Sequence, residues 1–158
     1  MVKILSLVVL AAIAYQDLSD RKVYTFVFPV LIGLLGYLHY QSVEIITFIS
    51  AICINIAMLT IIIGLLYLYT IVKIKRPFFE EVFGMGDVLF FVALAIGFPT
   101  MTFIILFVFS LIFSLLVWLV LKKRAKHDSV PLAGYMSIFF GVLFIMQWVT
   151  NSLTLYLI

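Results

Sequence analysis

Long apolar runs separated by short polar segments make up almost the whole chain. The polar breaks fall at residues 16–22, 39–44, 73–87, 97–100 and 122–129. The runs between them cover residues 2–15, 23–38, 45–72, 88–96, 101–121 and 130–148. A helix that crosses a bilayer needs roughly 17–25 residues with very few charges. The pattern therefore predicts an all-α protein that crosses a membrane several times.

The weak break at residues 97–100 decides how many helices there are. A single helix over residues 88–121 would be about 51 Å long, whereas the apolar core of a bilayer is only about 30 Å thick. Gly97 and Pro99 are turn-forming residues and lie inside this stretch. We therefore expect two helices here, and six in the whole chain.

The composition excludes several classes of protein. Of the 158 residues, 66% are hydrophobic and 11% are charged, whereas a soluble domain is about half apolar and about a quarter charged. One chain of this length predicts a single transmembrane domain over residues 1–158. Cys53 is the only cysteine, which excludes an internal disulfide or a cysteine-based zinc site. We expect no metal and no cofactor. We also expect no nucleic-acid partner, since the basic residues form short clusters like those of membrane loops.

The distribution of lysine and arginine predicts the orientation. With six spans, the breaks at residues 16–22, 73–87 and 122–129 fall on one side and carry nine of the ten basic residues, leaving only Lys3 opposite. With five spans the split would be five to five. Because basic loops stay in the cytoplasm, six spans are favoured, with both termini outside and membrane lipid around the bundle.

Two of the seven acidic residues stand at the same depth on the cytoplasmic side. Asp17 closes the first apolar run and Asp87 precedes the fourth. If their helices are neighbours, the two carboxyls can meet and one will hold a proton near neutral pH. The ionised member could then activate water while the protonated member polarises a peptide carbonyl. The alternative is that each aspartate only caps a helix end.

The segment Gly84-Met85-Gly86-Asp87 adds weight to the catalytic interpretation. Two glycines before an acid permit backbone conformations that other residues avoid, and they let another chain approach the carboxyl closely. This segment resembles the Gly-x-Gly-Asp signature of membrane aspartic proteases. Residues 16–23 resemble the first-aspartate segment of type IV prepilin peptidases and archaeal preflagellin peptidases. Residues 130–135, through Gly141, are similar to the last conserved helix start of that family.

The resemblance implies a function. In this family the residues that match Asp17 and Asp87 form a catalytic dyad in the plasma membrane. The dyad removes the short basic leader of pilin-like or flagellin-like precursors, which carry a class III signal peptide, at the cytoplasmic face. Larger members also carry paired cysteines linked to N-methylation of the product. This chain has no such cysteines, so we expect peptidase activity without methyl transfer.

Three further acids have a weaker claim on the substrate. Asp20, Glu80 and Glu81 lie in the predicted cytoplasmic segments and could attract a basic leader. The alternative is that they pair at the surface with basic neighbours, which contributes little energy.

Two rival functions stay open at this stage. Proteases of the presenilin or signal-peptide-peptidase kind share the Gly-x-Gly-Asp signature, but they place both acids deep inside their spans. A small transporter would need polar groups near the middle of the membrane, and only Asn55 and Gln147 qualify.

Overall fold

A computed structural model describes residues 1–74, 84–122, 130–150 and 155–156, and every regular element in that part of the chain is helical. The helices are α1 (Val2–Asp20), α2 (Val27–Ser42), α3 (Ile45–Tyr69), α4 (Met85–Gly97), α5 (Thr100–Leu121) and α6 (Leu132–Thr150), with a π-helical turn η1 (Thr70–Ile74) continuing α3. Each of the six predicted runs corresponds to one helix, which confirms the all-α prediction.

Membrane character follows from helix length and composition. Within the described residues, α1, α3, α5 and α6 are each long and apolar enough to cross a bilayer. The helices α2 and α4 have 16 and 13 residues, or about 24 and 20 Å at 1.5 Å per residue. The chain is therefore a helical membrane protein with at least four helices of spanning length.

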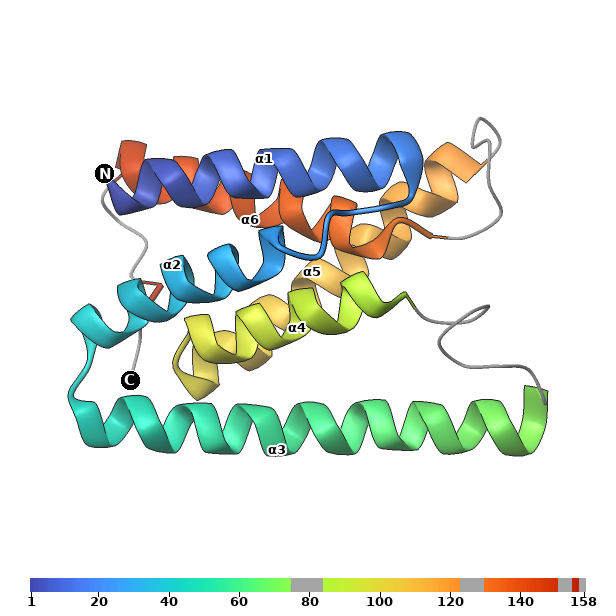
Figure 1. Cartoon of the computed structure of the whole chain (residues 1–158), viewed down its shortest axis with the longest axis horizontal. Helices are drawn as coiled ribbons and strands as arrows, with labels where there is room; N and C mark the ends of the chain where they lie inside the picture. The colour runs from blue at the N-terminus through green and yellow to red at the C-terminus, as the bar shows by residue number, and fades with distance from the viewer. Residues whose placement is uncertain (75–83, 123–129, 151–154, 157–158) are drawn as a thin grey trace.

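The helices run up and down in one bundle (Figure 1). The end of α1 and the starts of α4 and α6 lie at one end, while Met1 and the end of α6 lie at the other. The short helix α4 is central, because it packs against α2, α3, α5 and α6. The helix α1 packs mainly against α6 and α2, and α4 packs mainly against α2 and α3, so neither packs mainly against the other.

The predicted break between α4 and α5 is confirmed and has a local cause. The helix α4 ends at Gly97, and Phe98 is extended, with φ −139° and ψ 149°. A proline clashes with a helical residue before it, so Pro99 excludes the helical conformation at Phe98. The new helix α5 then begins at Thr100.

Two buried side chains donate hydrogen bonds to the backbone carbonyls left free at this break. The Asn55 amide nitrogen donates to the carbonyls of Ala95 and Phe98, at 2.9 Å in each case. The His39 ring donates from Nδ1 to the Ile96 carbonyl at 2.8 Å. The last carbonyls of a helix have no partner within it, so these bonds fix the end of α4 against α3 and α2.

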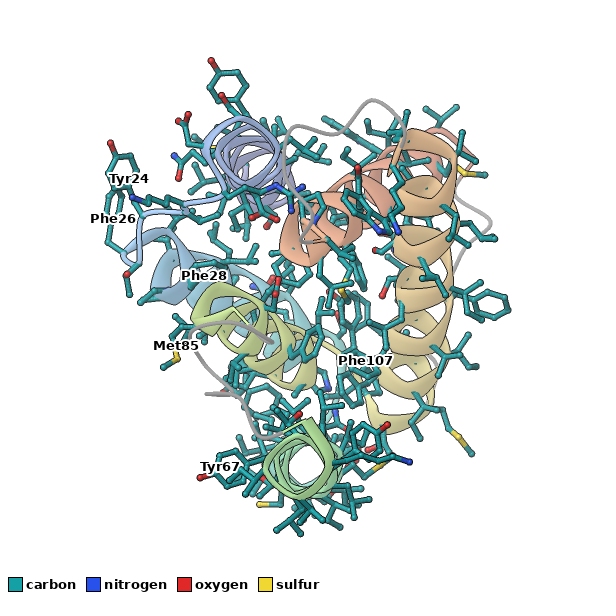
Figure 2. All side chains as sticks on the ribbon, turned by 90° about the vertical axis from the view of Figure 1, so that its right-hand side faces the viewer. Tyr24, Phe26, Phe28, Tyr67, Met85 and Phe107 are labelled. Atoms are coloured by element: carbon teal, nitrogen blue, oxygen red, sulfur yellow. The ribbon has the colours of Figure 1, made fainter. Side chains whose placement is uncertain are left out.

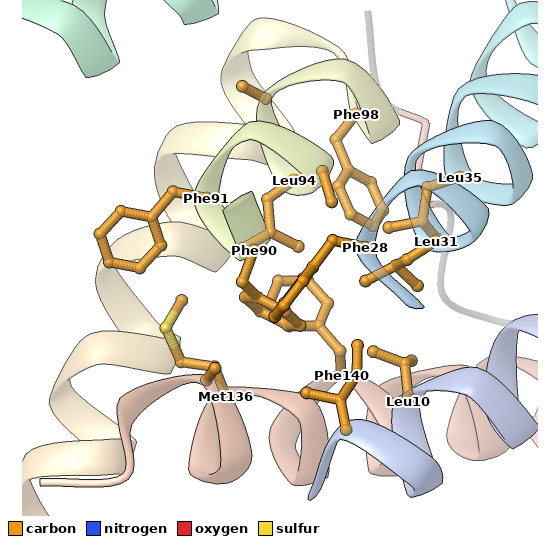
Figure 3. Packing of buried hydrophobic residues seen from close by; sticks show 14 of the residues in the cluster. Leu10, Phe28, Leu31, Leu35, Phe90, Phe91, Leu94, Phe98, Met136 and Phe140 are labelled. Carbon is orange, nitrogen blue, oxygen red and sulfur yellow. The ribbon is translucent and has the colours of Figure 1, made fainter. Parts of the chain in front are cut away.

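Aromatic and aliphatic side chains, most of them from α1, α2, α4 and α6, form the core (Figure 3), and Leu59 of α3 and Phe103 and Phe107 of α5 also belong to it. Phe28, Phe90 and Phe140 are among its fully buried members. The rings of Phe90 and Phe140 meet edge to face, with centroids 6.3 Å apart. This packing positions the start of α4 beside the start of α6.

The helices α2 and α4 lie close together at Gly97. A Cβ atom added there would lie 2.7 Å from Cβ of Leu35, a distance at which backbone must shift. We expect Gly97→Ala to destabilise the bundle by about 1–3 kcal/mol, as overpacking typically does. The melting temperature in detergent should fall by several degrees, whereas Gly33→Ala, which adds the same methyl group to open space, should not lower it. Equal melting temperatures would contradict the close packing of α2 on α4.

Candidate active site

Asp17 lies in the last turn of α1 and is partly buried. Its Oδ2 atom accepts a hydrogen bond of 2.6 Å from the backbone N–H of Gly134 in α6. The helix α1 ends just after it, at Arg21, which adopts the left-handed conformation with φ 55° and ψ 22°. Asp17 is thus held by another helix instead of capping its own.

Asp87 is the third residue of α4 and is also partly buried. Its Oδ1 atom accepts a hydrogen bond of 2.8 Å from the backbone N–H of Ala133. The two aspartates are 70 positions apart in sequence, yet they bind consecutive residues of α6. The charge of Asp17 also acts on Asp87, so the carboxyls are within electrostatic reach of each other.

The start of α6 explains why this can happen. Its first internal i to i−4 bond runs from the Tyr135 N–H to the Pro131 carbonyl, at 3.1 Å. The N–H groups of Ala133 and Gly134 precede this bond and have no carbonyl partner inside the helix. A helix N-terminus also carries partial positive charge, which favours carboxylates. The first turn of α6 therefore binds the carboxyls of Asp17 from α1 and Asp87 from α4 at two neighbouring N–H groups.

The glycines beside the dyad act through their missing side chains. A Cβ atom on Gly84 would lie 3.1 Å from Oδ2 of Asp87, and one on Gly86 would lie 3.3 Å from the Phe28 ring. Figure 2 looks onto this end of the bundle and shows Phe28 where α2 meets α4. Gly84 thus leaves room for the Asp87 carboxyl, and Gly86 leaves room for the Phe28 ring.

The other expectation for these glycines is wrong. Gly84 has an ordinary extended conformation, with φ −71° and ψ 136°. No described glycine has positive φ, and the unusual backbone in the described part of the chain is at Arg21. The two glycines before Asp87 are therefore explained by close packing and not by an unusual backbone conformation.

Gly134 is a site residue for which the sequence alone predicts no role. A Cβ atom on it would lie 3.0 Å from Oδ2 and 3.1 Å from Cβ of Asp17. The only sequence feature that could have indicated it is Pro131, since proline favours the start of a helix and free amides follow there. The sequence does not show which carboxyls bind these amides, because that depends on packing between helices that are distant in sequence.

One cation belongs to the site. The Arg21 guanidinium carbon lies 5.7 Å from the centre of the Trp118 ring of α5, a cation–π distance. Its charge acts on the carboxyls of both Asp17 and Asp87. Arg21 therefore compensates part of the negative charge of the dyad while its side chain is held on α5.

The other predicted acids are placed differently. Asp20 is exposed at the end of α1, and its carboxylate is 3.5 Å from the Ser19 hydroxyl, so it does not take part in the contacts of the dyad. Glu80 and Glu81 lie outside the described residues. Within the described part of the chain, no three His, Cys, Asp or Glu side chains gather as a metal ion would require.

The arrangement is suited to acid–base chemistry on water. Two partly buried carboxyls in electrostatic contact share one proton more readily than they hold two charges. Their bonds to α6 use Oδ2 of Asp17 and Oδ1 of Asp87, and the Asp87 carboxyl also accepts a hydrogen bond from the Gly84 backbone. Searches of protein-family models, curated proteins and solved structures find nothing that matches this chain.

Proposed function

We propose that this chain is a membrane aspartic endopeptidase that removes the short basic leader of type IV prepilin-like or preflagellin-like precursors. The observation that carries the proposal is the pair of carboxyls, from Asp17 and Asp87, held on consecutive amides of α6. Structural caps would need no such meeting of two acids from separate helices.

The dyad supplies both functions that hydrolysis of a peptide bond needs. The ionised carboxyl takes a proton from water as the water oxygen bonds to the scissile carbon. The protonated carboxyl donates a hydrogen bond to the carbonyl oxygen, on which negative charge develops. When the carbon–nitrogen bond breaks, the leaving nitrogen receives the proton taken from water. No cofactor or methyl donor enters these steps.

The position of the dyad in the bundle supports cleavage at the cytoplasmic border of the plasma membrane. Asp17 is in the last turn of α1 and Asp87 in the first turn of α4, at the same end of the bundle. In the sequence, the polar breaks at residues 16–22, 73–87 and 122–129 carry nine of the ten basic residues, and basic segments stay inside. In the proposed topology α2 and α4 complete six spans, and both termini are outside.

The substrate in this proposal is a precursor with a class III signal peptide, whose basic leader lies in the cytoplasm. The exposed Asp20 stands one turn beyond Asp17, and Glu80 and Glu81 precede the Gly-x-Gly-Asp segment in the sequence. The negative charge of these acids would favour the approach of a basic leader.

The rival functions have less support. An intramembrane protease of the presenilin kind would place its acids in the middle of its spans, whereas Asp17 and Asp87 lie at helix ends. A transporter would need Asn55 for its solute, but this amide is buried and donates to two carbonyls at the end of α4. Gln147, the other polar candidate, is partly buried near the end of α6.

Co-expression with a pilin-like precursor tests the proposal. We expect the precursor to lose its leader, and mass spectrometry of the product should place the cut between the basic leader and the apolar helix. The matched control is a chain with both Asp17→Asn and Asp87→Asn, which should leave the precursor intact. A cut inside the apolar helix would favour the presenilin-like rival, and equal processing by the control would exclude an aspartic mechanism.

A further inference from the structure

A groove of about 510 Å³ lies on the outer surface between α1 and α6. Its walls are residues 4–14 of α1 and residues 137–145 of α6, and Ser137 is the only polar residue among those that line it. The Ser137 hydroxyl donates to the Ala133 carbonyl at 2.6 Å, so its proton does not point into the groove as a donor for a ligand. We call this the α1–α6 groove, and its surface suits an apolar occupant.

The groove leads to the dyad because of helical spacing. On α1, Ala14 lines the groove and Asp17 is one turn further along, on the same side of the helix. On α6, Ser137 lines the groove and Gly134 is one turn before it. The hydrogen bond between Asp17 and Gly134 therefore closes the groove about 5 Å beyond its last lining residues.

A second apolar groove, of about 430 Å³, lies between α3 and α4, but it does not reach the dyad in this way. Val88 and Val92 form its α4 wall, so it lies on the face of α4 that packs on α3. The Asp87 carboxyl binds Ala133 of α6 instead. Figure 2 shows α3 on the opposite side of α4 from α1 and α6. This α3–α4 groove is thus behind the catalytic face.

The α1–α6 groove also has room for a close neighbour. No atom lies within 4 Å of the position that a Cβ atom on Gly141 would occupy. Ala11 is exposed on the facing wall. Small residues let the backbones of membrane helices approach closely, which is where their packing energy comes from.

We propose that the α1–α6 groove binds the apolar helix of the precursor and so sets the position of the cut. This inference rests on the proposed function. The bound helix would run parallel to α6 and antiparallel to α1, with its cytoplasmic end at Asp17. The leader would then pass over the dyad as it leaves the membrane, and the scissile bond would be the one where the helix begins.

Cross-linking in native membranes tests the location. Cysteines are placed at Ile138 and Ile145, both exposed on the groove wall, in a Cys53→Ala, Asp87→Asn chain that retains its substrate. A second cysteine is moved along the apolar helix of the precursor. We expect links at both sites, with the best partner of Ile145→Cys seven residues deeper than that of Ile138→Cys. Gly64→Cys, in the α3–α4 groove, should give none.

Kinetics give an independent readout. Gly141→Leu fills the open space in the groove, so KM for the full precursor should rise at least fivefold while kcat changes less than twofold. Gly64→Leu makes the same change at an equally open glycine of α3 and should alter KM less than twofold. Melting temperatures in detergent identify a variant that fails to fold. If Gly141→Leu fails to fold, the cross-links alone decide whether the α1–α6 groove binds the precursor helix.

The outcomes separate this inference from the proposed function. If the wild-type chain cleaves the precursor but links form only at Gly64→Cys, or at none of the three sites, the groove holds lipid and the docking inference is wrong. If the wild-type chain cleaves no precursor, the proposed function is wrong. Links at Ile138 and Ile145 without the seven-residue shift would contradict the parallel orientation.

Discussion

Asparagine in place of Asp17 or of Asp87 should lower the rate of leader cleavage by about 1,000-fold or more, as loss of one member of a catalytic unit does. Asparagine has the same shape as aspartate and its oxygen can still accept the bond from Gly134 or Ala133. It can neither take a proton from water nor hold the shared proton of the pair. Chemistry is thus lost while the packing of α6 on α1 and α4 is retained.

The measurement is single-turnover cleavage of a purified precursor in proteoliposomes. The double variant should be no slower than either single variant, since the two carboxyls act together and their effects are not additive. Glu44→Gln is the matched control, because Glu44 is an exposed acid at the start of α3, at the other end of the bundle. Substantial cleavage by both single variants, with unchanged melting temperatures, would reject the dyad.

The helices were predictable from sequence because each depends on local properties. Apolar runs bounded by charge can satisfy their backbone in a bilayer only as helices. The break after Gly97 followed from the excess length of residues 88–121 and from Pro99, and the structure reproduces it at Phe98. The number of spans is less local, since α2 and α4 are short helices whose burial depends on their neighbours.

The candidate site was predictable only in part, for a similar reason. Asp17 and Asp87 stand out because the chain has few charges and these two fall at the ends of apolar runs. Their meeting, however, depends on α6, since the two carboxyls bind the N–H groups of Ala133 and Gly134. The amides of Ala133 and Gly134 have no side-chain chemistry to indicate them, and Pro131 indicates only that a helix with free amides starts there.

Gly134→Ala, a change of one methyl group, should reduce cleavage roughly 10- to 100-fold, because small displacements of catalytic groups have effects of this size. The added Cβ would lie 3.0 Å from Oδ2 and 3.1 Å from Cβ of Asp17. To relieve this contact, the Asp17 side chain must shift by a few tenths of an ångström, and the bond of 2.6 Å between the Gly134 N–H and Asp17 lengthens. The loss should be in kcat more than in KM, since the carboxyl and not the groove is displaced.

Gly33→Ala is the control, because it adds the same methyl group to a helix at a site with no atom within 4 Å. Alanine is more favourable in a helix than glycine by about 1 kcal/mol, so neither variant should lose helix content. In an Asp17→Asn background the added methyl should cost little further activity, because the group that it displaces no longer reacts. A Gly134→Ala chain with full activity would mean that the carboxyl reacts without its bond to α6, and α6 would then stabilise the fold without positioning the dyad.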